Sequence, residues 1–399
     1  MIENSPDNSF RDSPFKRRLS GRIPEVDGLR GLAILGVLVF HLFCRGIDYE
    51  KSHWIATYAA KIGSIGSTGV DLFFVISGFL IGGILIDTRE SPNYFKTFYL
   101  RRIFRIFPLY YGLLFIFYIL SFASAYKLIS VANWMVGFNF SGKWYLTFTQ
   151  NFPMARDGNL GAAALAPTWS LAVEEQFYVL LPLIIFFVPR KYLTALVVAL
   201  IFGASIFRTV TWHQTSSIIA TRMQMPGCLD SLMMGVLIAI LLRSPKPSIL
   251  IERYRLKLVI PVLLVLLMVL FIVYKFSLNA WPKFAENQWI LGSPMFSLLY
   301  GSLIILAVSA KPKHLLSKFL CNNLLRKIGQ LSYFIFLFHV GINIFVRWLT
   351  GSIAKPPFGI TWFFEIGLTL IITIFLANLS WHYFEKPLMK LGHKYGYKT

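Results

Sequence analysis

One apolar stretch near the N-terminus reads Asp27-Gly-Leu-Arg-Gly-Leu-Ala-Ile-Leu-Gly-Val-Leu-Val-Phe-His41. It carries a cation near its start, Arg30, and an imidazole at its end, His41. At ~100° per residue the two side chains lie on one helix face, about 16 Å apart along the axis. Ionisable groups within a membrane span usually face the bundle interior and have a function. An arginine that snorkels to the membrane edge and a histidine satisfied by a neighbouring helix would give the same pattern.

The composition around this stretch is that of a membrane protein. Hydrophobic residues make up 56% of the 399 residues and charged residues only 14%, whereas soluble domains are about a quarter charged. Apolar runs such as Leu258 to Tyr274 and Ile360 to Leu379 are long enough to cross a bilayer. The three cysteines are far apart in the sequence, so they predict neither a disulfide framework nor a metal site.

We therefore predict an all-α fold, a polytopic bundle of about ten transmembrane helices. The predicted spans are roughly 26–44, 67–86, 104–124, 169–188, 192–212, 227–242, 257–275, 289–309, 328–349 and 360–381. The aromatic segment 127–168 is broken by glycines and polar residues, and we expect it to be partly embedded on the outer side. We divide the chain into a disordered cytoplasmic tail (1–22), a membrane domain (23–388) and a basic cytoplasmic tail (389–399).

The basic residues decide the orientation. If the segment 127–152 does not cross and the N-terminus is inside, most lysines and arginines of the loops fall on the inner side, as the positive-inside rule requires. The C-terminal lysines, from Lys386 to Lys398, are then also inside. We expect a multi-pass protein of the cell membrane with both termini in the cytoplasm. The same distribution explains the net charge of +21 as a topology signal, so nucleic acid is not an expected partner.

A cluster of arginines is predicted at the cytoplasmic face. Arg101, Arg102 and Arg105 begin the third span with i,i+3 and i,i+4 spacing, so they form one cationic surface together with Arg30. Arginine forks suit phosphate groups. Ordinary anchoring of the helix by lipid headgroups would require the same residues.

Two histidines are predicted deep in the bundle, His41 near mid-depth and His339 in its own span. A neutral imidazole can take a proton from a hydroxyl near neutral pH, which is general-base chemistry. A single histidine on an apolar helix is more often a satisfied core group, but two in one bundle favour a site.

Carboxylates are predicted on the outer side. Asp71 lies at the outer end of the second span, and Glu174 and Glu175 lie early in the fourth. Adjacent glutamates point ~100° apart, so one of the two is expected to face a cavity. Ser170 and Tyr178 share a face with Glu174 at i,i+4 spacing. Such an acid could orient an imidazolium or bind an acceptor hydroxyl, although a helix N-terminus also favours acids for its dipole alone.

The stretch Gly78-Phe-Leu-Ile-Gly82 has small residues four positions apart. This spacing is typical of close helix packing, and we expect no chemistry from it.

Six motifs occur in a fixed order along the chain. They are Asp27-Gly-Leu-Arg-Gly-Leu-Ala with Arg30-x10-His41, Gly69-Val-Asp-Leu-Phe-Phe-Val-Ile-Ser-Gly-Phe-Leu-Ile81, Arg101-Arg-Ile-Phe-Arg-Ile-Phe-Pro108, Trp169-Ser-Leu-Ala-Val-Glu-Glu-Gln-Phe-Tyr178, Ser332-Tyr333 to His339, and Glu385-Lys-Pro387. In this order they resemble the acyltransferase 3 family of integral-membrane acyltransferases, from about residue 23 to residue 388. The departures are small: Phe336 stands where a tyrosine is common, and Ala172 where a serine is common.

The resemblance implies transfer of an acyl group, usually acetyl, from cytoplasmic acetyl-CoA to a hydroxyl of an extracytoplasmic glycan or lipid-linked sugar. By position, Arg30 and His41 match the essential pair of the family, and Arg101, Arg102 and Arg105 match its arginine motif. Membrane lipids are the other expected partner, no metal is expected, and the oligomeric state is not predicted.

We extend these roles as a hypothesis that orders the site by depth, with cations inside, the histidine in the middle and acids outside. The donor phosphates would bind Arg101, Arg102, Arg105 and Arg30, and His41 would activate the acceptor hydroxyl. The acids Asp71, Glu174 and Glu175 would assist catalysis. The acceptor would contact a further set of side chains: Asp71, Trp169, Ser170, Tyr178 and His339.

Two other functions fit parts of this pattern. A proton-coupled transporter or exporter could use the same histidines and acids as a proton relay, although the inverted repeats common in such proteins are not evident here. A membrane sensor or assembly partner without catalysis is the third possibility.

Overall fold

The computed structural model describes residues 13, 15–19, 21–44, 63–126, 140–260, 262, 264, 267, 293–311, 314–352 and 360–398. Every regular element in these ranges is helical. Eight helices in the described residues are long and apolar enough to cross a membrane. The polytopic helical bundle predicted from the sequence is thus confirmed, and the chain is a multi-pass membrane protein.

The long helices coincide with predicted spans, although α5 begins ten residues earlier than predicted and the last helix continues to His393. They are α2 (Pro24–Val39) with the π-helical turn η2 (Phe40–Cys44), η3 (Ile65–Thr68) with α4 (Gly69–Asp87), α5 (Tyr94–Ala125), α9 (Thr168–Phe187), α10 (Arg190–Thr215), η5 (Met225–Cys228) with α12 (Leu229–Arg243), α18 (Asn323–Leu349), and α19 (Ile360–Ser380) with the π-helical turn η8 (Trp381–Glu385) and α20 (Lys386–His393). The predicted span 289–309 is the shorter helix α16 (Ser293–Ser309). Most of the predicted span 257–275 lies outside the described residues.

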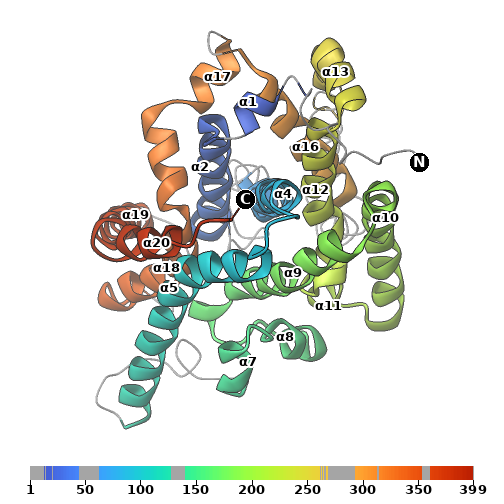
Figure 1. Ribbon diagram of the computed structural model, residues 1–399. Helices are drawn as coiled ribbons and strands as arrows, with labels where there is room; N and C mark the ends of the chain where they lie inside the picture. Colours follow the sequence, from blue (N-terminus) through green and yellow to red (C-terminus); the bar gives the residue numbers. More distant parts are fainter. Residues whose placement is uncertain are drawn as a thin grey trace, which may run out of the picture.

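Helix α4 lies near the centre of the bundle and is seen end-on in Figure 1, with α2, α9, α12 and α16 in contact with it. The closest approach is between α4 and α12. A Cβ atom on Gly78 would lie 1.9 Å from the backbone oxygen of Leu232, and one on Gly235 would lie 2.1 Å from that of Val75. Only glycine fits such contacts, so the packing role predicted for the Gly78–Gly82 stretch is confirmed.

Helices α2 and α18 form a second close pair and run in the same direction. A Cβ atom on Gly31 would lie 2.3 Å from the backbone oxygen of Leu325, and one on Gly329 would lie 1.9 Å from that of Asp27. This packing holds α2 and α18 in register along their length. Residues that follow these contacts on the two helices are therefore neighbours.

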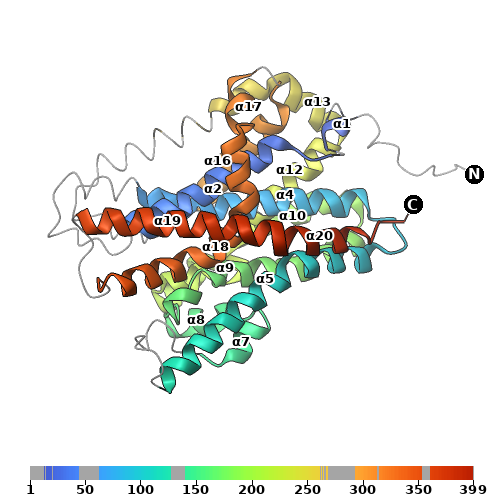
Figure 2. The same ribbon diagram turned by 90° about the vertical axis from the view of Figure 1, so that its left-hand side faces the viewer.

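The segment 127–168, which we expected on the outer side, folds into short helices in its described part. They are α7 (Gly142–Leu146), α8 (Asn151–Asp157) and the 3₁₀ turn η4 (Ala163–Leu165). Figure 2 shows α7 and α8 beside one end of α5. Two tyrosines of α5 hold this segment, because Tyr110 donates a hydrogen bond to the backbone oxygen of Tyr145 and Tyr111 to that of Leu146, both at 2.8 Å. Residues 127–139 lie outside the described residues.

The N-terminal segment includes a packed part, which differs from the disorder expected over 1–22. The short helix α1 (Lys16–Leu19) follows Phe15, whose side chain is buried. The hydroxyl of Ser13 donates a hydrogen bond of 2.6 Å to the backbone oxygen of Leu242 at the end of α12. Arg18 forms an ion pair with Glu25 in the first turn of α2. These contacts tie the segment to the bundle.

Candidate active site

A cavity lies between five helices, α2, α4, α5, α9 and α18, and offers about 200 Å³ to water-sized molecules. One part of its wall is apolar, with Phe73, Phe74 and Leu80 of α4. The other part is polar and includes these side chains: Arg30, Ser77, Arg102, Arg105, Ser170, Glu174, Tyr178, Ser332 and Tyr333. The cavity thus brings together six of the residues singled out from the sequence.

The arginines of this cavity lie well inside their helices. Helix α5 begins at Tyr94, ten residues before the predicted start, so Arg102 and Arg105 are ~12 to 17 Å along its axis from that start. These two arginines therefore lie in the body of α5 and not at its start. Arg30 donates a hydrogen bond of 3.0 Å to the hydroxyl of Ser332, and the Arg102 guanidinium lies 5.7 Å from the ring centre of Tyr178. Polar and aromatic side chains from neighbouring helices thus accommodate these charges inside the bundle.

Glu174 lines the same cavity and interacts electrostatically with Arg30, Arg102 and Arg105. It also hydrogen bonds to Ser77, whose hydroxyl is 2.5 Å from that of Tyr178. The expected order of depth, with the acids outside the cations, therefore does not hold for Glu174. Helices α5 and α9 pack antiparallel, since Tyr94 of α5 bonds to Pro182 of α9 and Tyr99 to Val179. This packing brings the second turn of α9, with Glu174, to the level of the arginines.

Glu175 does not line this cavity. It is buried, at 9% exposed, and is not among the residues of the cavity wall. Its carboxylate interacts electrostatically with Tyr110, Tyr111 and Tyr333. The helix periodicity left open which of the two adjacent glutamates faces a cavity, and the structure selects Glu174.

His41 and His339 lie next to each other, with ring centres 4.9 Å apart. The Nδ1 atom of His41 is 3.1 Å from the backbone oxygen of Val37, and that of His339 is 2.9 Å from the oxygen of Ile335. A carbonyl oxygen only accepts, so Nδ1 carries the proton in each ring. In the neutral imidazoles, Nε2 is then the basic nitrogen, which is the atom that general-base catalysis requires.

The histidine pair adjoins the cavity through Phe336. This side chain lines the cavity, and its ring centre is 6.3 Å from that of His339. His41 itself belongs to the π-helical turn η2, and such turns are frequent at functional sites. Neither histidine is among the lining residues of the cavity. The structure therefore places the histidines behind Phe336, beside the arginine cavity.

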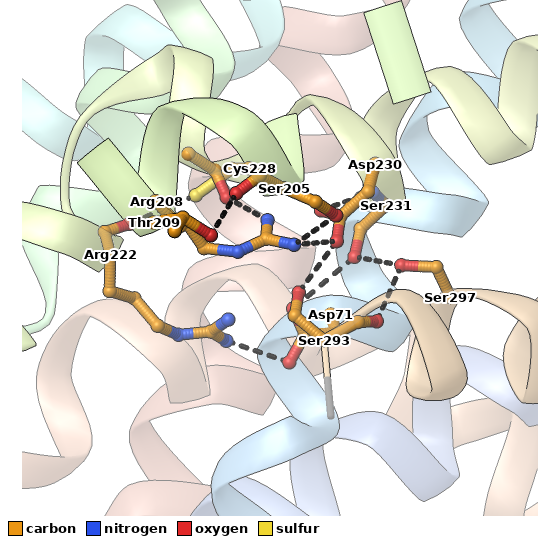
Figure 3. Close-up of polar contacts among 11 residues, drawn as sticks. Asp71, Ser205, Arg208, Thr209, Arg222, Cys228, Asp230, Ser231, Ser293 and Ser297 are labelled. Carbon is orange, nitrogen blue, oxygen red and sulfur yellow. Dashed lines mark hydrogen bonds and ion pairs between the residues drawn. The ribbon is translucent and has the colours of Figure 1, made fainter. Parts of the chain in front are cut away.

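Asp71, an expected catalytic and acceptor-binding residue, lies elsewhere in a buried ion-pair network (Figure 3). Its carboxylate pairs with Arg222 at 2.7 Å and accepts a hydrogen bond of 3.3 Å from Ser231. Trp169, an expected acceptor contact, stacks near the same arginine, with 6.0 Å between the guanidinium and the ring centre. Neither Asp71 nor Trp169 lines the cavity. The assignment of Asp71 to the outer part of the site is therefore not supported by its position, since Arg222 already neutralises its charge.

The same network contains a second ion pair, between Arg208 and Asp230 at 2.9 Å, with both side chains fully buried. Ser293 donates a hydrogen bond of 2.8 Å to Asp230, and Ser231 lies 2.8 Å from Ser297 (Figure 3). Two arginines and two aspartates give no net charge. The network joins α4, α10, α11 (Ile218–Arg222), α12 and α16. We therefore interpret it as a structural link between these helices.

Arg101 is separated from the other two arginines of its motif. Its Nε donates a hydrogen bond of 2.9 Å to the backbone oxygen of Tyr395, and its guanidinium lies 5.1 Å from the ring centre of Tyr397. Asn93 fixes the same tail by a 2.8 Å hydrogen bond to the oxygen of Gly396. Burial raises the pKa of the Tyr397 phenol, so the ring stays neutral beside the cation. The single cationic surface expected from the spacing is therefore divided: Arg102 and Arg105 line the cavity, whereas Arg101 contacts the C-terminal tail.

Four residues to which the sequence analysis gave no role belong to this site: Ser77, Ser332, Tyr333 and Glu385. Ser332 and Ser77 contact charged site residues directly, and Tyr333 donates a hydrogen bond of 2.9 Å to the oxygen of Ile106. Glu385 is buried in the second π-helical turn and interacts electrostatically with Arg30 and Arg105. All four lie within the motifs quoted above, and this membership was the sequence feature from which they could have been predicted as site residues. No group of three potential metal ligands occurs in the part of the chain that the structure describes.

Comparison with known proteins identifies the family of the chain. The family model described as an acyltransferase domain matches residues 23–381. The chain is 27% identical over 393 residues to O-acetyltransferase OatA of Staphylococcus aureus strains NCTC 8325 / PS 47 and COL, and 28% identical over 389 residues to SACOL0978 of strain COL. These alignments cover 93% of this chain and 58% of each relative.

No solved structure matches the chain. The family model, by contrast, covers nearly the whole sequence and includes the arginine cavity and both histidines. The chain belongs to the acyltransferase 3 family.

Proposed function

We propose that this protein is a membrane O-acyltransferase that moves an acetyl group from cytoplasmic acetyl-CoA to a hydroxyl of an extracytoplasmic glycan. One observation carries the proposal: a cavity with three arginines adjoins a pair of histidines across a single aromatic side chain, Phe336. The relatives named OatA are O-acetyltransferases, and the chain spans 58% of their length. The acetyl donor, the glycan acceptor and the location in the cell membrane with cytoplasmic termini are parts of this proposal.

The cavity fits part of such a donor. An acyl-CoA has anionic phosphates joined to a long flexible arm with a thioester at its end. Arg30, Arg102 and Arg105 supply the cations for an anionic group, and the apolar wall of α4 supplies a surface for the arm. About 200 Å³ is less than the ~300 to 1,000 Å³ of pockets that hold whole drug-sized ligands. We infer that only one end of the donor enters the cavity.

The chemical step follows from the tautomer of the histidines. Nε2 of His41 would accept the proton of the acceptor hydroxyl while its oxygen attacks the thioester carbonyl. A C–O bond forms, the C–S bond breaks, and the thiolate leaves with the proton that the imidazolium returns. His339, 4.9 Å away between ring centres, would hold the His41 ring in position. A covalent acyl-histidine route uses the same nitrogen.

The test is His41→Ala in the full chain, expressed in cells that lack the gene, with His213→Ala as the matched control. His213 is exposed and lies in the last turn of α10, so it belongs to no part of the site. Mass spectrometry of the surface glycans should show an acetyl-sized mass that the wild type and the control restore and His41→Ala does not. If folded His41→Ala restored the acetylated glycan at the wild-type level, the proposed role of His41 would be refuted.

A second measurement separates the donor from the acceptor. Turnover of labelled acetyl-CoA in isolated membranes reports the donor side whatever the acceptor is. If the wild type turned over acetyl-CoA but no glycan were acetylated, the proposed acyltransferase activity would stand and the proposed glycan acceptor would be contradicted. Absence of turnover with an intact, folded chain would contradict acetyl-CoA as the donor.

A further inference from the structure

A second pocket lies on the other side of α18 and has a strongly basic wall. It offers about 390 Å³ to water-sized molecules. Its wall is formed by Arg22 before α2, by the first turns of α18, and by the turn η8 with the start of α20. Four of its lining residues are cationic: Arg22, Arg326, Lys327 and Lys386. We refer to it as the basic pocket.

The charges of the basic pocket are poorly balanced. Arg22 pairs with Asp27 at 2.7 Å. In the described ranges, no carboxylate forms an ion pair with Arg326, Lys327 or Lys386. The Nε atom of Arg326 is buried without a hydrogen-bond partner among these residues. Three uncompensated cations in one concave site favour an anionic ligand, because gathering like charges is otherwise unfavourable.

The uncharged groups of the pocket also suit an anion. Amides of Asn323, Gln330 and Asn378 line it and can donate hydrogen bonds. The side chain of Asn322 caps the backbone N–H groups of Leu324 and Leu325 at the N-terminus of α18, so this helix of 27 residues contributes only the positive end of its dipole. Trp381 adds a half-buried aromatic ring of the kind found at membrane interfaces.

The basic pocket is distinct from the cavity of the proposed active site. Leu331 lines the basic pocket, whereas the next residues, Ser332 and Tyr333, line the cavity. Likewise Lys386 lines the basic pocket, while buried Glu385 interacts with the arginines of the cavity. Helix α18 and the turn η8 therefore separate the two. A ligand of the basic pocket does not need to take part in acyl transfer.

We propose that the basic pocket binds a phosphate group. A phosphate combines the negative charge with the several acceptor oxygens that guanidinium, ammonium and amide donors require together. Basic pockets between membrane helices on the cytoplasmic side bind anionic headgroups in this way. The phosphate is carried either by an anionic membrane lipid or by a soluble phosphorylated molecule, and the two sources are separated by experiment.

The experiment uses the full chain purified in detergent and native mass spectrometry. Phosphatidylglycerol and phosphatidylcholine with identical acyl chains are titrated as lipid probes, and adenosine 3′,5′-bisphosphate is titrated as the soluble probe. The test variant is Arg326→Gln with Lys327→Gln. The matched control is Arg253→Gln with Lys257→Gln, two exposed cations outside the pocket. Melting temperatures of all variants establish that each chain is folded.

We expect one probe to bind the wild type and the control equally and the test variant about 30-fold more weakly, from ~1 kcal/mol per lost cation. If this probe is phosphatidylglycerol, the phosphate source is a lipid; if it is adenosine 3′,5′-bisphosphate, the source is soluble. Equal binding of both probes to the test and control variants would overturn the proposal. The cations would then serve only as a topology signal.

Discussion

Replacing Asp71 by asparagine tests whether the buried network of Figure 3 is structural or catalytic. In the structure the Asp71 carboxylate is 3% exposed and pairs with Arg222, which is 6% exposed, at 2.7 Å. Asparagine keeps the shape and can still accept the hydrogen bond from Ser231. It removes the negative charge and directs an NH₂ group or a neutral oxygen at the guanidinium.

The magnitude follows from the burial of both partners. Breaking a buried ion pair by removing one charge costs ~3 to 5 kcal/mol, because the remaining charge stays buried without compensation. Here the network would change from neutral to a net charge of about +1. We therefore expect Asp71→Asn to lower the melting temperature of the purified chain and the yield of folded protein. Activity per folded molecule should change little.

Two comparisons make this prediction sharp. Asp157→Asn removes a carboxylate from an exposed pair with Arg156 and should leave the melting temperature unchanged. The double variant Asp71→Leu with Arg222→Met replaces both charges by apolar groups and should recover much of the stability. Thermal melting in detergent and labelled acetyl-CoA turnover, normalised to folded protein, give the two readouts. Wild-type stability with lost turnover in Asp71→Asn would refute the reasoning and return Asp71 to the active site.

Three further predictions concern the cavity and the helix packing. Glu174→Gln should lower kcat/KM for acetyl transfer by about 100-fold, as loss of a charged group in a preorganised site does. Glu175→Gln should lower kcat/KM by less than about tenfold, and acetyl-CoA turnover measures both variants. Arg105→Gln should raise the KM for acetyl-CoA about tenfold through one lost charge-assisted contact. Arg101→Gln should leave this KM unchanged and expose the C-terminal tail to proteolysis. Equal effects of the two variants on KM would contradict the division of the arginine motif. Gly78→Ala should abolish the folded protein, because its Cβ would lie 1.9 Å from a backbone oxygen, and Gly203→Ala, with nothing within 4 Å, should melt like the wild type.

The membrane-spanning helices could be predicted from the sequence because hydropathy depends on local composition. Eight predicted spans coincide with long apolar helices of the described residues. The ends were less certain where charge occurs inside a helix. Helix α5 begins at Tyr94 although the charged run Arg101 to Arg105 suggested a later start. Partners on α9, on the turn η8 and on the C-terminal tail make those charges tolerable in the bundle.

The sequence by itself thus determined the helical membrane fold, the family and the residue types of the candidate site. Only the tertiary structure decided which of these residues meet. The partner of Asp71 is 151 positions away in the sequence, and Arg30 meets a serine 302 positions away. The periodicity of one helix does not predict contacts between residues so far apart in the sequence, because a contact between helices depends on how their surfaces pack. For this reason only the structure shows that Glu174 lies beside the arginines, that Asp71 pairs with Arg222 outside the cavity, and that Arg101 contacts the C-terminal tail.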